Sequence, residues 1–182
     1  MKKGFLMVVS GPSGVGKGTI CDILLRDNKD IKYSISATSR NKRPNEEHGK
    51  NYFFVSNDEF EKMIADKKLL EYARVHGNYY GTPKDFVLNS INQGDVVILE
   101  IDVQGALQVK KNYPDAVLVF VLPPDFEELK RRLVERGTED EETVNLRMNN
   151  AKKEVEFLNE YNYSIVNDFI DESAVSYTHL RA

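Results

Sequence analysis

Residues 5–17 read FLMVVSGPSGVGK, and this stretch decides the fold. Its first five residues are all apolar and the run stops at Ser10, which is typical of a short strand buried on both faces of a parallel sheet. The residues just beyond it, 19–26, carry apolar side chains at helical spacing. The stretch therefore predicts a strand, a glycine-rich loop and a helix, in that order.

The loop matches the pattern G-x-x-x-x-G-K in the strand-to-helix setting that this phosphate-binding motif requires. Its glycines allow backbone N–H groups to point at phosphate oxygens, and the helix N-terminus favours a polyanion. Lys17 supplies a positive charge that can follow a transferring phosphoryl group. The residues expected to contact ATP are Gly11, Pro12, Ser13, Gly14, Val15, Gly16, Lys17, Gly18 and Thr19.

Gly18 stands where many such loops place a Ser or Thr hydroxyl for magnesium. Its presence weakens the interpretation of the chain as a GTPase switch. We expect Mg²⁺ to be held mainly by phosphates and water, as this ion commonly is, with Thr19 as the one candidate protein ligand.

Two further apolar runs, residues 96–101 and 116–122, predict buried strands. Helices are expected at 104–111 and 126–136. Strands alternating with helices indicate an α/β fold, namely a three-layer core with a mostly parallel sheet.

Residues 34–90 differ from the core, and we interpret them as an inserted mixed α/β lobe. A short β-rich run at 52–55 is followed by Ser56 and Glu59, which are spaced as a capping box that opens a helix. Another strand is expected at 69–76.

Thr82 and Pro83 predict the start of a further helix, with Thr82 as its N-cap. Residues 136–147 are rich in charge and are expected to form a mobile flap or a solvated connection. The predicted division is a core of 1–33, 91–124 and 151–182, an inserted lobe of 34–90 and a lid of 125–150.

A basic and aromatic group could form a second phosphate site. Its members are Arg40, Arg43, Tyr52, Tyr79 and Tyr80. Two arginines can clamp a phosphate, and tyrosine hydroxyls can donate further hydrogen bonds. Taken alone, the group could equally consist of surface arginines and half-buried tyrosines, but a kinase requires such an acceptor site.

Three acidic residues, Glu71, Glu100 and Asp102, lie beside apolar runs. Ligands of open α/β sheets gather at the carboxyl ends of the strands. One carboxylate can accept both the N1–H and N2–H of guanine, whereas adenine offers no such pair. A buried glutamate is costly without a partner, so a ligand is a reasonable one. The alternative is that Glu71 is a solvated strand residue.

Arginines border the charged segment at positions 131, 132, 136 and 147. Closure of this segment could bring Arg136 and Arg147 onto the transferring phosphate, where they would stabilise transition-state charge. For Arg131 and Arg132 we favour a solvated helix face.

The composition of the chain excludes several classes of protein. The 182 residues carry a net charge of −4, which argues against a general nucleic-acid binder. No apolar run reaches the roughly 18 residues of a membrane span, and the N-terminus lacks the features of a signal peptide. The single cysteine, Cys21, excludes an internal disulfide and fits a reducing cytoplasm.

Seven stretches, taken together and in order, closely resemble guanylate kinase. They are residues 11–17, 36–40, 49–53, 77–82, 101–105, 136–138 and 165–168. The likeness runs from about residue 4 to residue 168. It implies ATP-dependent phosphorylation of GMP, and of deoxy-GMP, in purine nucleotide metabolism, by a monomer or small homo-oligomer in the cytoplasm that uses Mg²⁺.

The resemblance also implies residue roles. The GMP phosphate would be held by Arg40, Arg43, Tyr52 and Tyr80. The guanine would be read or positioned by Ser36, Glu71, Thr82 and Asp102. Catalysis would depend on Lys17, Arg40, Arg136 and Arg147, and Asn167 would lie near the ATP base.

Three alternatives remain at this point: a kinase for AMP or a pyrimidine nucleotide, a non-catalytic interaction module, and a GTPase switch. Glu71 would separate a GMP kinase from a kinase for AMP or a pyrimidine nucleotide, because replacing it with glutamine should weaken the use of GMP. The intact loop with Lys17 argues against a non-catalytic interaction module. Residues 172–182 lack the apolar stripe of the terminal helix usual in relatives. We hypothesise that they are foreign sequence joined to a truncated chain.

Overall fold

The computed structural model describes residues 4–75, 77–135 and 140–168. Arg136 and residues 172–182 lie outside these ranges, so the expectations for them stay predictions. Within the described ranges, no helix combines the length and apolar character needed to cross a membrane.

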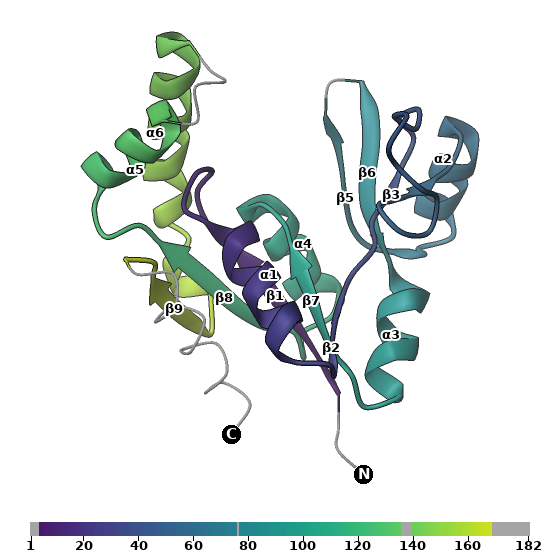
Figure 1. Cartoon of the computed structure of the whole chain (residues 1–182). Coiled ribbons are helices and arrows are strands. Elements are labelled where there is room, and N and C mark those ends of the chain that lie inside the picture. Colours follow the sequence, from purple (N-terminus) through teal and green to yellow (C-terminus); the bar gives the residue numbers. More distant parts are fainter. Residues whose placement is uncertain (1–3, 76, 136–139, 169–182) are drawn as a thin grey trace.

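The central element is a five-stranded parallel sheet in the order β2-β7-β1-β8-β9 (Figure 1). Its strands are β1 (Phe5–Ser10), β2 (Ile31–Tyr33), β7 (Val96–Glu100), β8 (Val117–Leu122) and β9 (Tyr163–Val166). The three apolar runs of the sequence form β1, β7 and β8, which confirms those predictions. They are the three inner strands, where both faces are buried.

Helices cover both faces of this sheet and give the expected three layers. The alternation of β1 divides the core: Met7 and Val9 pack against α1 (Lys17–Asp27), α5 (Phe126–Glu135) and α6 (Glu141–Val155). Leu6 and Val8 face the opposite way, against α3 (Lys84–Asn92) and α4 (Val103–Asn112). The α/β class predicted from the sequence is therefore confirmed.

A second, four-stranded sheet has the order β4-β3-β6-β5 and is mixed in direction. Its strands are β3 (Ala37–Thr38), β4 (Phe53–Phe54), β5 (Leu69–Val75) and β6 (Asn78–Pro83). Helix α2 (Asn57–Ala65) packs on it through the fully buried Phe60. The capping box is confirmed, because Ser56 accepts from the Glu59 N–H and Glu59 accepts from the Ser56 N–H.

Helix α4 joins the two sheets along the outer side of β5, the edge strand of the small sheet. The Gln108 side chain bonds both backbone groups of Tyr72, accepting from N–H at 3.2 Å and donating to the carbonyl at 3.1 Å. One turn on, Asn112 donates to the Leu70 carbonyl at 2.7 Å. Side chains of α4 thus complete hydrogen bonds that a neighbouring strand would otherwise make.

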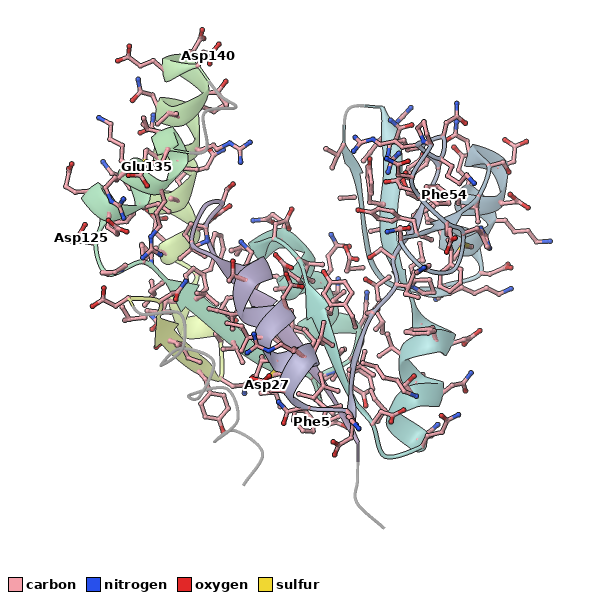
Figure 2. The ribbon with its side chains drawn as sticks, viewed as in Figure 1. Phe5, Asp27, Phe54, Asp125, Glu135 and Asp140 are labelled. Carbon is pink, nitrogen blue, oxygen red and sulfur yellow. The ribbon has the colours of Figure 1, made fainter. Side chains whose placement is uncertain are left out.

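Two groups of elements extend from the large sheet, with the loop after β1 between them (Figure 1). One contains α5 and α6, and the other contains the small sheet and α2. In Figure 2, Glu135 and Asp140 lie in the first group, and Phe54 lies in the second. The division of the chain into core, lobe and lid remains a prediction.

One local expectation was wrong. Helix α3 begins at Lys84 with Pro83 as its N-cap residue, and Thr82 is the strand residue before it. The Thr82 hydroxyl does not cap, because it donates to the Glu71 carboxylate. In the described part of the charged segment, Asp140 caps α6 and the chain is helical from Glu141. The interpretation of the segment as a mobile flap stays a prediction.

Candidate functional site

The glycine-rich loop links β1 to α1, as the sequence predicted. Gly11, Gly14 and Gly16 have φ angles of 138°, 88° and 93°, where other L-residues are strained. A Cβ on Gly11 would also lie 2.3 Å from the Val121 carbonyl oxygen. The loop therefore requires glycine for both conformation and space, and α1 begins directly after it with no side-chain cap on its N–H groups.

Lys17 is folded back into this loop. Its ammonium donates to the carbonyls of Gly11 at 2.6 Å and Pro12 at 2.9 Å. Burial lowers the pKa of Lys17, and the negative charges of Glu100 and Glu154 oppose that shift. The result is a desolvated positive charge held at the edge of the phosphate cradle, where its electrostatic effect is larger than in water.

Arg147 connects α6 to the same loop. Its Nη1 atom donates a hydrogen bond to the Ser13 hydroxyl, although the two residues are 134 positions apart. The fold thus brings together a residue of the glycine-rich loop and an arginine that borders the charged segment. Arg136, the other arginine expected here, is outside the described residues.

A cavity of about 190 Å³ lies between the small sheet and the ends of β7 and α4. Five predicted residues line it: Ser36, Tyr52, Glu71, Tyr80 and Asp102. Asp102 also caps α4, accepting from the Gly105 N–H at 2.8 Å. Residues from β5, β6 and β7, and from the segments just before β3, β4 and α4, therefore line one small space.

Glu71 is the buried acid of this cavity, only 6% exposed. Thr82, fully buried, donates its hydroxyl to the Glu71 Oε1 atom at 2.7 Å. Burial raises the pKa of Glu71 to about 7, and the nearby Asp102 charge adds to the rise. Glu71 is therefore not a solvated strand residue, and it retains acceptor capacity that Thr82 does not use.

Arg40 lies beside the aromatic wall of the cavity. Its guanidinium is 5.6 Å from the Tyr52 ring centre and 5.8 Å from that of Phe54. It forms a two-point ion pair with Glu46, with N–O distances of 2.8 and 3.0 Å. This pairing lowers the pKa of Glu46 to about 2 and, with the Tyr80 hydroxyl, raises that of Arg40.

The other members of the basic and aromatic group lie in different places. Tyr52 and Tyr80 are in edge contact at 6.1 Å. Tyr79 faces the other side of the sheet, stacked on Phe60 at 5.0 Å. Arg43 is exposed and is absent from the cavity lining, although its backbone N–H donates to Glu46. The structure therefore gathers Arg40, Tyr52 and Tyr80, and Arg43 is linked to them through Glu46.

A second cavity, of about 390 Å³, lies on the opposite side of the loop. It is lined by Gly14, Gly16, Thr19, Glu128, Arg131, Arg132, Asn167 and Asp168. Arg131 and Arg132 both pair with Glu128. Arg131 is exposed, as expected of a solvated helix face, whereas Arg132 is half-buried and donates to the Asn167 carbonyl.

Asn167 supports the loop. It is 2% exposed, and its Nδ2 atom donates to the Val15 carbonyl at 2.7 Å. A Cβ on Gly16 would lie 2.4 Å from that nitrogen. Arg132 in turn donates to the Asn167 carbonyl at 3.1 Å.

Sequence reasoning missed this support and the pairing of Arg40 with Glu46. For the support by Asn167, the only sequence signal was an asparagine after an apolar dipeptide, which is too common to be informative. For the Arg40–Glu46 pair, the only signal was a glutamate six residues after an arginine.

The order of strands explains why the cavities flank the loop. Strand β1 leads into the loop, β7 pairs with it on one side, and β8 followed by β9 lies on the other. The first cavity uses residues 100–102 at the end of β7, and the second uses Asn167 after β9. Two ligands bound at the carboxyl ends of these strands would meet over the loop.

The chain is similar to known proteins over nearly its whole length. The family model for guanylate kinase matches residues 3–181. The guanylate kinase of Caldanaerobacter subterraneus subsp. tengcongensis is 51% identical over 94% of this chain and 84% of its own length. That of Clostridium tetani is 51% identical over 95% of this chain and 83% of its own.

A solved structure is similar as well. The crystal structure of guanylate kinase from Anaplasma phagocytophilum has a TM-score of 0.75 and 31% identity, and covers 99% of this chain and 85% of that one. Family model, sequence relatives and solved structure thus point the same way over nearly the whole chain. The chain belongs to the guanylate kinase family.

Proposed function

We propose that the chain transfers the γ-phosphoryl group of ATP to GMP. The observation that carries this proposal is Glu71, a buried carboxylate with unused acceptor capacity in a cavity beside a phosphate-binding loop. Guanine offers such a group two adjacent donors, and a buried polar group left unpaired would be costly. In this proposal GMP occupies the cavity with Glu71, and ATP occupies the cavity with Asn167.

The reaction is a direct in-line displacement. An oxygen of the GMP phosphate attacks the γ-phosphorus, a new P–O bond forms, and the bond to the β-phosphate oxygen breaks with release of ADP. The attacking group is already an anion, so no protein nucleophile and no covalent enzyme intermediate are required. The protein has to align two polyanions and offset their repulsion.

The residues present suit these tasks. Lys17 and Arg147 would contact the ATP phosphates, because both side chains reach the loop. Arg40, with Tyr52 and Tyr80, would hold the GMP phosphate, which requires exchange of at least part of its contact with Glu46. Deoxy-GMP carries the same base and phosphate, and we include it as an acceptor.

Magnesium fits the ATP side of this site. Thr19, in the first turn of α1, offers a hydroxyl at the ATP cavity, and the ion would take its other ligands mainly from phosphates and water. When bound, Mg²⁺ neutralises charge on the β- and γ-phosphates. The protein groups around it then orient the nucleotide.

The proposed reaction also requires two parts of the chain to close over the bound nucleotides. We propose that residues 34–90 close over GMP and residues 125–150 over ATP, on a core of 1–33, 91–124 and 151–182. Helix α3 packs on the large sheet, so residues 84–90 would stay with it, and the rest of the lobe would pivot on the N-terminal side of that helix. Closure would exclude water, which could otherwise accept the phosphoryl group. We place this activity in the cytoplasm.

The first test is ADP formation from ATP and Mg²⁺ with GMP, AMP, UMP, CMP or dTMP as the only acceptor. We expect activity with GMP at least about 100-fold above the other four, as hydrogen-bonded base recognition allows. Comparable activity with AMP would overturn the assignment of Glu71 to guanine. Inactivity with all five, from folded protein that binds ATP, would overturn the proposed reaction.

The raised pKa of Glu71 predicts a pH dependence for GMP. Below its pKa of about 7 the carboxyl is protonated and can no longer accept both guanine donors. The KM for GMP should therefore rise by about 10-fold from pH 8 to pH 6. Steady-state kinetics at saturating ATP measure this. The GMP phosphate also titrates in this range, so Glu71→Gln provides the control: its KM should change less, and an equal change would assign the effect to the nucleotide.

Asn167→Asp should act on ATP alone. The substitution replaces the amide that donates to Val15 with a carboxylate that faces a carbonyl oxygen. We expect KM for ATP to rise by about 10-fold or more, because a buried hydrogen bond is replaced by repulsion. KM for GMP should stay within about twofold. A matched rise in both constants would indicate general unfolding, which a thermal melt would reveal.

A further inference from the structure

A third cavity, of about 390 Å³, lies beside β5. The described residues that line it are Ile64, Lys67, Leu69, Tyr72, Lys84 and Asn112. It shares none of these residues with the two cavities assigned to nucleotides, and its volume is that of a small-molecule site. No acidic side chain is among them, whereas four can donate hydrogen bonds and two of those four are positively charged. The cavity therefore suits an anion.

The strand register brings the two lysines of this cavity together. Leu69 pairs with Pro83 at the start of β5, and the Lys84 N–H donates to the Lys68 carbonyl at 2.8 Å. Lys67 and Lys84 therefore lie on neighbouring segments at one end of the small sheet. Within the described ranges, neither of these two lysines forms an ion pair. Two uncompensated charges at one cavity favour a ligand with at least two negative charges, such as a diphosphate.

The backbone of Lys67 gives a second reason to expect a use for its side chain. Its φ angle of 55° is the only positive φ of a residue other than glycine in the described part of the chain. Its N–H donates to the Ile64 carbonyl at 3.0 Å, and the Lys68 N–H donates to the Met63 carbonyl at 2.9 Å. These are the two hydrogen bonds of a Schellman motif, in which glycine usually takes the position of Lys67. A side chain kept at this position, at a conformational cost, is what a function of the lysine would explain.

The cavity spans the joint between the lobe and the large sheet. Lys67 and Tyr72 belong to the part of the lobe that would move on closure. Lys84 and Asn112 lie on α3 and α4, and both helices pack on the large sheet. An anion in this cavity would therefore contact both sides of the joint and hold them in the arrangement described here.

This arrangement is not the one that GMP requires. Arg40 is paired with Glu46, and holding the GMP phosphate would require exchange of at least part of that contact. A ligand shifts an equilibrium toward the arrangement that it fits better. An anion that fits the third cavity as it stands would therefore favour this arrangement over the closed one.

We propose that the third cavity binds the diphosphate group of a small anion, and that this binding weakens the binding of GMP. Lys67 and Lys84 would hold the diphosphate charges, with the Tyr72 hydroxyl as a further donor. Ile64 and Leu69 would contact an organic substituent where the anion carries one. The regulatory half of this inference rests on the proposed function, because it assigns GMP to the first cavity.

The binding test is a titration followed by ¹H–¹⁵N NMR, with ADP present so that the glycine-rich loop is occupied. The probes are inorganic pyrophosphate and isopentenyl diphosphate, which share the diphosphate group and contain no base. We expect either probe to shift the backbone amides of Lys67, Tyr72 and Lys84. Lys67→Gly combined with Lys84→Gln should weaken this binding by about 10-fold or more, because both charged contacts are lost. Glycine adopts the conformation of Lys67 without strain, so the double variant should keep its fold, as a thermal melt would show.

The regulatory test is the KM for GMP, measured at saturating ATP and constant free Mg²⁺. Each probe should raise this KM in the unchanged protein by about 5-fold or more, a typical size for coupling between two sites. The rise should be at least about threefold smaller in the double variant. Lys68→Gln is the matched control, because Lys68 is the neighbouring lysine, pairs with Asp66 at 3.5 Å and does not line the cavity. It should respond to the probes as the unchanged protein does.

The two probes also distinguish the source of the diphosphate. Equal effects would identify inorganic pyrophosphate as sufficient, and a larger effect of the ester would identify an organic diphosphate that uses the apolar wall. Both results support the site.

Three results would overturn the inference. Amides of Lys67 and Lys84 that do not respond to either probe would exclude the site. An equal rise in KM in the unchanged protein and the double variant would show that diphosphate acts only at the nucleotide cavities. An equal loss of response in Lys68→Gln would show a general effect of surface charge.

Failure of this inference is distinct from failure of the proposed function. An active GMP kinase whose third cavity does not respond to diphosphate would reject this inference alone. If the unchanged protein did not phosphorylate GMP, the proposed reaction would be rejected, and the NMR titration would still decide whether the cavity binds diphosphate.

Discussion

Glu71→Gln should lower kcat/KM for GMP by about 100- to 1,000-fold and leave KM for ATP within about twofold. The glutamine keeps one oxygen that can accept, including from Thr82. Its second polar group is an amide donor, which would face a donor of guanine. A buried site loses this much when a hydrogen bond is replaced by two opposed donors.

The same substitution should stabilise the protein at alkaline pH. The folded pKa of Glu71 is about 7 against an ordinary value of 4.5, so the folded state binds more protons than the unfolded state between these values. Stability therefore falls as pH rises through this window. At pH 8, Glu71→Gln should raise the free energy of unfolding by about 1–3 kcal/mol, and at pH 4 the gain should vanish.

Urea denaturation at the two pH values measures the stability change, and steady-state kinetics measure the loss of GMP use. Glu61→Gln, an exposed carboxylate on α2, is the matched control and should alter neither. A stabilised protein with full activity toward GMP would show that Glu71 is buried for a reason other than guanine. A destabilised protein at pH 8 would contradict the raised pKa.

Lys17→Met should reduce kcat by about 1,000-fold while the protein stays folded. The methionine retains the unbranched apolar stem and loses the charge. The ammonium is already desolvated among the Gly11 and Pro12 carbonyls, so its loss removes a positioned charge that solvent cannot replace. Single-turnover measurement of ADP formation would separate this effect from product release.

Lys17→Arg provides the comparison, because it keeps the charge with a larger, planar head group. We expect it to recover little activity, since the space between two loop carbonyls suits an ammonium. Full activity in Lys17→Arg would show that charge alone suffices. A loss of less than about 10-fold in Lys17→Met would exclude Lys17 from the transition state.

The sequence predicted the inner strands of the large sheet and missed its edges for one physical reason. Strands β1, β7 and β8 are buried on both faces, so each is a continuous apolar run. The edge strands β2 and β9 are largely exposed and carry no such run. Helix α6 was missed because only Val144 and Ala151 are buried along its length, which leaves no continuous apolar stripe.

The site was predictable where residue chemistry is specific and unpredictable where it depends on folding. The loop from Gly11 to Lys17 has few other uses, and Glu71 follows two residues that proved buried. Thr82 was misjudged because its hydroxyl has two possible uses, capping a helix or bonding a carboxylate. Only the pairing of β5 with β6, whose register shifts between Leu69 and Tyr72 and lets the Thr82 hydroxyl reach Glu71, decides between them.

The contact between α4 and β5 has a consequence for the behaviour of the protein in solution. An uncovered edge strand is a template on which another chain can add a strand, and this is a common route to aggregation. Gln108 occupies both outward backbone groups of Tyr72 and Asn112 occupies the Leu70 carbonyl, so this part of the edge is closed to a second molecule. Helix α4 therefore protects the chain from self-association at the strand that carries Glu71.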